Sequence, residues 1–194
     1  VQESLGSRNG YARRESRGGD TNGRLGPREA AFIGERDSFY MASISETGWP
    51  YVQHRGGPRG FVRVLDEAMI GFADFAGNRQ YVSVGNLMGD ERVSLFFMDY
   101  ANRARLKLFG RAMFVAGDDA RLDEQLRVPG HEARIERGIL IRVEAFDWNC
   151  PQHITPRFTA DDVEGLVAPL KARIEELEAE RARETAEQSS ACGG

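Results

Sequence analysis

The stretch VSLFFMDYANRARLKLFGRAMFVA, residues 93–116, decides the fold class of this chain. It consists of two apolar or alternating runs joined by the polar sequence DYANR. In the second run, Arg105 and Lys107 fall on one face. Leu106 and Leu108 fall on the other face, because successive side chains of a strand point to opposite sides of the sheet. The stretch therefore predicts two long strands joined by a turn.

Turn residues punctuate much of the remaining chain about every 8 to 12 positions, which is the spacing of an antiparallel sheet or barrel. The sequence Thr47-Gly48-Trp49-Pro50, for example, predicts a turn between two such runs. We expect about six or seven strands in a mainly β fold. The predicted strands are Phe39–Ser45, Tyr51–Arg55, Phe61–Leu65, Met69–Ala73, Val93–Met98, Arg105–Ala116 and Ile139–Phe146.

A few segments have helical patterns instead. They are Glu29–Arg36, Asn78–Met88 with Asn78 as N-cap, Asp118–Arg127, and Thr159–Glu187 with Thr159 or Asp161 as cap. The last helix is amphipathic and is expected to be kinked or restarted at Pro169. Beyond Leu177 its pattern is only charged, so its apolar stripe is too short for a long coiled coil. We expect this stripe to pack against its own barrel in preference to a partner helix.

The length of 194 residues, with 41% hydrophobic and 29% charged residues, is typical of one globular domain with tails. Residues 1–28 are mostly Gly, Arg, Ser, Asn and Asp, a composition that predicts a flexible arm. We place the barrel domain at 29–158, the C-terminal helix at 159–188 and a tail at 189–194.

Several functional classes are disfavoured by the composition and the motifs. The net charge of −4 gives no basic excess for binding nucleic acid. No apolar run approaches the roughly 20 residues that cross a membrane, and residues 1–10 are polar where a signal peptide is apolar, so a cytoplasmic location is expected. Cys150 and Cys192 make no disulfide framework, and the histidines lack the spacing of zinc ligands. Nucleophile-elbow and phosphate-loop motifs are absent.

The sequence Gly77-Asn78-Arg79-Gln80 is the strongest candidate for a binding site. At a helix start it would combine unpaired backbone amides, a positive dipole and a guanidinium, which together suit a phosphate. An ordinary helix cap with a surface arginine is the alternative. Further cations that a barrel could bring to the same rim are Arg55, Arg59, Arg63, Arg105 and Lys107.

The order of several motifs resembles the pyridoxamine 5'-phosphate oxidase-like flavin proteins. The run Phe39–Pro58 is similar to the first hairpin of that family. The motifs within Gly71–Tyr81, Arg92–Phe97 and Leu108–Ala112 follow in the family's order and spacing. The resemblance covers about Phe32–Phe158.

This resemblance implies a split β-barrel that forms a homodimer and binds FMN in grooves between the subunits. Asn78, Arg79 and Gln80 match the phosphate-binding turn of the family, with Gln80 in place of a lysine. The cofactor-binding residues that we expect are Arg55, Arg59, Arg63, Phe72, Ala73, Asp74, Asn78, Arg79, Gln80, Arg105, Lys107 and Trp148. The backbone of residues 72–74 would line the flavin ring.

The segment 147–158 resembles the Trp-Asn-Cys-Pro-Gln-His segment of an uncharacterised branch of the family. Trp148 either stacks near the flavin or closes the barrel. The leading hypothesis is an FMN-dependent oxidoreductase acting on a small-molecule substrate or electron donor. The alternatives are a flavin-binding or redox-sensing module without turnover, and a deazaflavin-dependent reductase. A dimer is also expected from apolar surface at Phe96, Phe97, Phe109 and Phe114.

Overall fold

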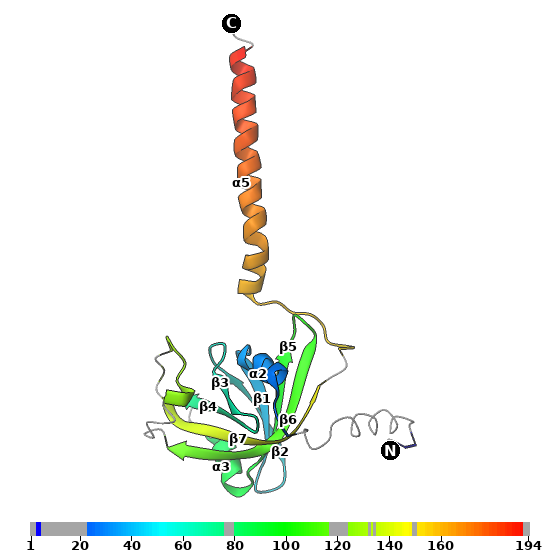
Figure 1. The fold of residues 1–194 in the computed structure, drawn as a ribbon, viewed down its shortest axis with the longest axis vertical. Coiled ribbons are helices and arrows are strands. Elements are labelled where there is room, and N and C mark those ends of the chain that lie inside the picture. Colours follow the sequence, from blue (N-terminus) through cyan, green and yellow to red (C-terminus); the bar gives the residue numbers. More distant parts are fainter. Residues whose placement is uncertain are drawn as a thin grey trace. The chain divides into compact units, whose positions relative to one another are not determined.

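The computed structural model describes residues 3–4, 23–75, 80–116, 124–131, 133, 135–148 and 151–191, with side chains up to residue 184. The chain divides into two compact units, Val1–Ile154 and Thr155–Gly194. The first unit holds the sheet and the second holds the long C-terminal helix (Figure 1).

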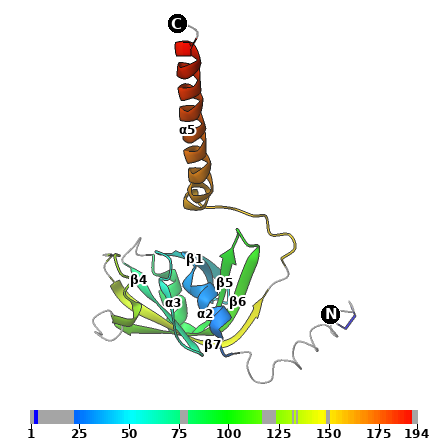
Figure 2. The ribbon, with the colours of Figure 1, turned by 45° about the horizontal axis from the view of Figure 1, so that its top comes forward.

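The first unit is built on a seven-stranded antiparallel sheet within the described residues. Its order is β2-β1-β5-β6-β7-β4-β3, so β2 and β3 are the two edges. Figures 1 and 2 show the sheet curled into an open barrel. The strands are β1 (Ser38–Ile44), β2 (Pro50–Gly56), β3 (Val62–Asp66), β4 (Met69–Phe75), β5 (Arg92–Asp99), β6 (Ala104–Ala116) and β7 (Ile135–Trp148). The predicted fold class and all the predicted strands are confirmed.

The core lies on the inward face of this sheet, where the side-chain alternation of the strands directs the apolar residues. Phe39 on β1 contacts the rings of Phe61, Phe72 and Phe97 at centroid distances of 5.8, 5.2 and 5.0 Å. Leu106 and Leu108 of β6 are fully buried, as the alternation predicts. Phe97 is also fully buried, so the expectation that it contributes to an exposed apolar surface is wrong.

The segment before β1 contacts the barrel at Leu25, within the range 1–28 that composition predicts to be a flexible arm. Leu25 is buried, and its amide donates to the carbonyl of Glu67 at 2.6 Å. Helix α2 (Pro27–Gly34) then begins with a proline in its first turn. A hydrogen bond from the Gly26 amide to the Glu29 carboxylate closes its N-terminus at 3.1 Å. One buried leucine in a polar stretch is a weak compositional signal, which is why the composition did not indicate this contact.

Helix α3 (Val82–Gly89) starts later than predicted, because Gln80 and Tyr81 are not helical. Tyr81 has a φ of 51°, in the left-handed region, and its phenol donates to the Glu136 carboxylate at 3.3 Å. The proposed cap, Asn78, lies outside the described residues. The prediction of one continuous helix over Asn78–Met88 is wrong, since Gln80 and Tyr81 are not helical and α3 begins at Val82.

The two remaining predicted helices can be compared with the structure only in part. Residues 117–123 lie outside the description, and 124–126 are helical. The last helix, α5 (Ala160–Ala191), is one element with Pro169 inside it and does not restart there. Thr159 caps it as predicted, because the Asp162 amide donates to the Thr159 hydroxyl at 3.1 Å and the Thr159 amide donates to the Asp162 carboxylate at 2.9 Å.

Candidate functional site

The described residues hold one inward-facing ionic cluster at the end of β4, which we call the Asp74 cluster: Arg55, Asp74, Tyr81, Glu136 and Arg137. Asp74 lies two residues after Phe72, on the same inward face, and is 9% exposed. Arg55 Nη1 donates to Asp74 Oδ1 at 2.7 Å. Arg137 Nε lies 3.4 Å from Asp74 Oδ2. Strands β2 and β4 therefore each supply one charged residue to this cluster, and β7 supplies two.

Register explains why these side chains meet. Arg55 is opposite Phe39 in the β1–β2 pair, so it shares the inward face with that core residue. Arg137 is directly opposite Asp74 in the β4–β7 pair. Its guanidinium also lies over the ring of Tyr81 at 5.1 Å and pairs with Glu136 at 3.3 Å. Sequence reasoning missed Arg137, because only the long-range strand pairing places it beside Asp74.

The Asp74 cluster has unused donor capacity. The Nε of Arg55 is buried and makes no hydrogen bond, whereas the buried Nε of Arg137 faces Asp74 Oδ2 at 3.4 Å. A buried donor without an acceptor is unfavourable, by about 1–3 kcal/mol. Two guanidinium groups beside the end of β4, one of them with an unused buried donor, are suited to bind an anion such as a phosphate. The net positive charge of the Asp74 cluster is limited, however, because the carboxylates of Asp74 and Glu136 already balance the two guanidinium groups.

The neighbouring edge of β4 is also open. Strand β3 pairs with β4 only up to the Val62–Phe72 pair, whereas β7 continues to pair with Ala73, Asp74 and Phe75. Within the described residues, no strand therefore pairs with 73–75 on the side away from β7. The side chains of Phe72 and Ala73 are buried in apolar clusters, so these two residues can offer a ligand only their backbone.

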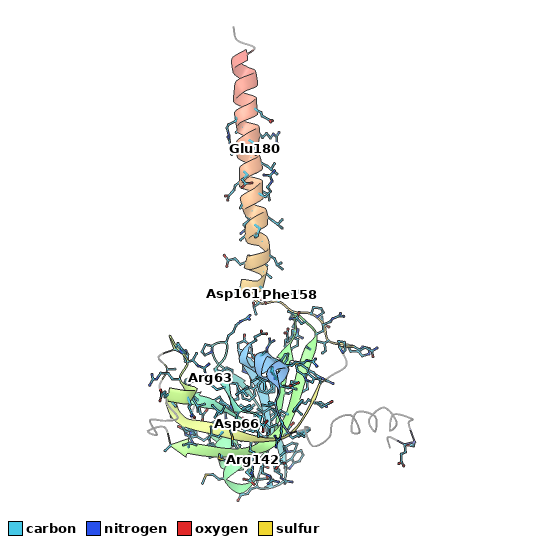
Figure 3. All side chains as sticks on the ribbon, in the orientation of Figure 1. Arg63, Asp66, Arg142, Phe158, Asp161 and Glu180 are labelled. Carbon is cyan, nitrogen blue, oxygen red and sulfur yellow. The ribbon has the colours of Figure 1, made fainter. Side chains whose placement is uncertain are left out.

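Other predicted site residues lie elsewhere. Arg63 is opposite Gly71, on the reverse face of the β3–β4 pair, and donates to the carbonyl of Arg127 at 3.2 Å; Figure 3 labels it on β3. The structure does not bring Arg63 to the Asp74 cluster. Arg59 and Gln80 each have an interaction partner. Asn78 and Arg79 lie outside the described residues.

Arg105 and Lys107 are on the outer face of β6. Lys107 forms an ion pair with Asp147 at 3.2 Å, and the Arg105 guanidinium lies over the Phe96 ring at 5.4 Å. This outer face continues over β1, β2 and β5 and carries exposed apolar side chains, including Tyr40, Val52 and Phe109, which are 39%, 61% and 48% exposed. The predicted cofactor-binding residues are thus divided between the two sides of the sheet.

Trp148 holds helix α2 against the barrel. Its indole N–H donates to Glu29 at 2.7 Å, and its ring meets Phe32 edge-on at a centroid distance of 4.8 Å. The Arg28 guanidinium lies 4.1 Å from the ring centroid. These contacts favour the barrel-closing alternative for Trp148.

A second buried ion pair serves the fold and lies apart from the Asp74 cluster. Arg36, after α2, contacts Asp99 at the end of β5 at 3.0 Å, and both side chains are 11% exposed. Burial alone would raise the pKa of Asp99. Hydrogen bonds from Asn102 and the charge of Arg36 outweigh it, so the pKa is lowered from its ordinary value.

An open seven-stranded antiparallel barrel with a charged cluster at its rim defines the class of this protein as a split β-barrel. A family model for pyridoxamine 5'-phosphate oxidase matches residues 25–142, which is more than half of the chain. The chain belongs to this family. No protein of curated function matches it.

Solved structures agree on the fold. The HupZ protein of Group A Streptococcus has a TM-score of 0.52 and 13% identity, covering 69% of this chain and 100% of its own. A putative pyridoxamine 5'-phosphate oxidase from Lactobacillus delbrueckii has a TM-score of 0.50 and 17% identity, covering 64% of this chain and 94% of its own. No helix among the described residues is long and apolar enough to cross a membrane.

Proposed function

We propose that this protein is an FMN-dependent oxidoreductase that acts as a homodimer on a small-molecule substrate or electron donor. The observation that carries the proposal is the Asp74 cluster, where the guanidinium groups of Arg55 and Arg137 meet at the open end of β4 and the buried Nε of Arg55 has no hydrogen-bond acceptor. Membership of the family whose model matches residues 25–142 supports a flavin. The resemblance of the motifs within residues 32–158 implies FMN.

In this proposal the phosphate of FMN is held by Arg55 and Arg137 together with Arg79. A third cation is needed, since Asp74 and Glu136 balance the first two and a phosphate dianion would otherwise meet a carboxylate. In the sequence, Arg79 is four residues after Phe75, where β4 ends, and one residue before Gln80. Charge-assisted hydrogen bonds from guanidinium groups are the strong contacts that such a phosphate requires.

The separation of Asp74 from Arg105 supports a site shared by two subunits. Opposite sides of one sheet cannot both touch a single flavin ring. The outer face of β6 in a second copy could supply Arg105 and Lys107 to a flavin bound at the Asp74 cluster of the first. The exposed apolar residues of that outer face would be covered in such a dimer.

When bound, FMN would supply the hydride chemistry. The role of this chain's residues is then to bind and orient. Arg55, Arg79 and Arg137 fix the phosphate end, and the backbone of residues 73–75 borders the ring. We assign no side chain as general acid or base, because hydride transfer to a flavin does not require one. The cytoplasm is the proposed location.

A titration of FMN and riboflavin tests the proposed phosphate site. We expect Arg137→Met to weaken FMN binding on the order of ten- to a hundredfold, because a charge-assisted bond of roughly 1.5–3 kcal/mol is lost. Riboflavin has no phosphate, so its affinity for the variant should equal its affinity for the unmodified chain. The matched control is Arg142→Met on the same strand, at an exposed position, which should change neither affinity.

Equal weakening of both ligands by Arg137→Met would mean that the residue supports only the fold. Turnover is tested separately, by following oxidation of a nicotinamide donor with the FMN-loaded protein. Tight FMN binding without any turnover with nicotinamide or other small-molecule donors would favour the redox-sensing alternative. Preferential binding of a deazaflavin would favour the reductase of that class.

A further inference from the structure

Helix α5 carries a narrow apolar stripe. Its residues are spaced alternately by four and three positions and are Val163, Val167, Leu170, Ile174 and Leu177. Val163, Leu170, Ile174 and Leu177 are 47%, 63%, 55% and 47% exposed. A single helix cannot cover its own stripe, and this 4-3 spacing is the a/d pattern of a left-handed coiled coil.

The residue types in the stripe indicate the kind of partner. In heptad terms, Val167 and Ile174 occupy a positions, and Leu170 and Leu177 occupy d positions. β-branched residues at a combined with leucine at d favour parallel two-stranded coiled coils. Pro169 falls at c, away from the seam, where it would not meet a partner helix.

We propose that α5 pairs in parallel, and in register, with α5 of a second copy of this chain over residues 163–177. This pairing would leave each of the five apolar residues facing its own counterpart. It does not depend on FMN, so it can hold or fail independently of the proposed enzymatic function.

The charges beside the stripe distinguish the two possible orientations. In the parallel register, Arg173 at g faces the partner's Glu178 at e, and the symmetry of the pair forms this contact twice. An antiparallel pair with the stripes fully overlapped would instead set Lys171 against the partner's Lys171 and Glu164 against the partner's Glu178. Each exposed ion pair contributes only about 0.2–1 kcal/mol, but here the charged contacts favour the parallel orientation and oppose the antiparallel one.

The predicted coiled coil is short. After Leu177 the seam positions are Arg181 and Glu184, so the apolar layers end there. Two heptads are marginal as an isolated pair. A second contact between the same two chains, such as the proposed barrel dimer, would raise the effective concentration of one α5 near the other and stabilise the pairing.

Cysteine cross-linking in the full chain tests the proposal. In a background of Cys150→Ser and Cys192→Ser, the variants Val163→Cys and Leu177→Cys place one thiol at either end of the stripe. The matched control is Glu176→Cys, at the outward c position. We expect each seam variant to form a disulfide-linked dimer at least about tenfold faster than the control under mild oxidation, because the pairing raises the local thiol concentration.

Other results would overturn the proposal. Cross-linking only in a mixture of Val163→Cys with Leu177→Cys would indicate an antiparallel pair. Equal rates at 163, 176 and 177 would indicate no specific pairing. Slow cross-linking of both seam variants would mean that something else, such as the chain's own barrel, covers the stripe.

A charge exchange gives an independent readout of the dimer by sedimentation. Arg173→Glu and Glu178→Arg should each weaken dimerisation, because each creates two like-charged contacts. The double variant should restore it, since the opposite charges again face each other. Glu176→Arg is the control, because it also removes the Arg173–Glu176 pair at 2.8 Å but lies outside the seam. Absence of rescue in the double variant would contradict the parallel register.

Discussion

Asp74 is the residue on which the charged groups of the barrel rim converge. It accepts a hydrogen bond from Arg55, and it is opposite Arg137 in the sheet. A carboxylate that is almost buried is favourable only where cations surround it. In the proposed site, Asp74 orients the two guanidinium groups, while their remaining donors serve the anion.

The first residue-scale prediction concerns Arg79. We expect Arg79→Ala to weaken FMN binding on the order of ten- to a hundredfold, since it removes a charge-assisted bond of roughly 1.5–3 kcal/mol. Riboflavin affinity should be unchanged. Fluorescence titration of both ligands measures the two effects in one experiment.

The control for this experiment is Arg13→Ala, in the segment predicted to be a flexible arm, which should change neither affinity. If Arg79 were only a surface residue near a helix start, Arg79→Ala would alter stability by a few tenths of a kcal/mol and leave FMN binding intact. That result would restrict the phosphate site to the other arginines.

The second residue-scale prediction concerns the pH dependence of stability through Asp99. Because the pKa of Asp99 is lowered in the folded state, its contribution is fully present above its unfolded pKa of about 3.9 and is lost as the pH falls through the folded pKa. Asp99→Asn should cost about 1–3 kcal/mol at pH 7, because it leaves the buried Arg36 guanidinium without its counter-ion.

Urea unfolding at pH 7 and pH 3 measures this difference. The free-energy gap between the unmodified chain and Asp99→Asn should narrow at pH 3. A gap of equal size at both pH values would contradict the ionic account and point to packing or hydrogen bonding alone.

At the scale of elements, local sequence pattern specified β6 well and the start of α3 poorly. The alternation of Leu106 and Leu108 with charged residues is visible in the sequence, and both leucines are buried. The left-handed Tyr81 makes its hydrogen bond to Glu136, which is 55 residues away in the chain, so no local pattern around Tyr81 indicates this contact. Arg137 escaped prediction for the same reason, since strand register is a long-range property.

Helix α2 gives the element-scale prediction. We expect Trp148→Phe to destabilise the fold by about 1–2 kcal/mol, because the hydrogen bond to Glu29 and part of the contact with Arg28 are lost. FMN affinity should remain unchanged. Urea unfolding and FMN titration of the same variant provide the two readouts. A large loss of FMN affinity with unchanged stability would assign Trp148 to the flavin site after all.

At the scale of the whole molecule, the outer face of the barrel and the stripe of α5 both present apolar surface. Tyr40, Val52 and Phe109 lie on the first of these surfaces, and Phe96 lies among them on β5. Composition indicated that apolar surface would remain exposed, but it did not distinguish the buried Phe97 from the outward Phe96. The strand alternation in the folded sheet makes that distinction.

We predict that the FMN-loaded protein is a dimer at micromolar concentration. The reason is that a flavin site shared by the two sides of the sheet requires two copies. Light scattering coupled to size exclusion gives the mass directly. A monomer that retains its flavin would show that one subunit forms the whole site. Arg105 and Lys107 would then no longer be assigned to the flavin site.

The measurement that tests the central claim most directly is identification of the bound cofactor. Protein purified without added flavin is predicted to be yellow, and after denaturation its supernatant should contain FMN rather than FAD, riboflavin or a deazaflavin. Colourless protein that does not take up added FMN would contradict the account. So would a supernatant that contains a different flavin in stoichiometric amount.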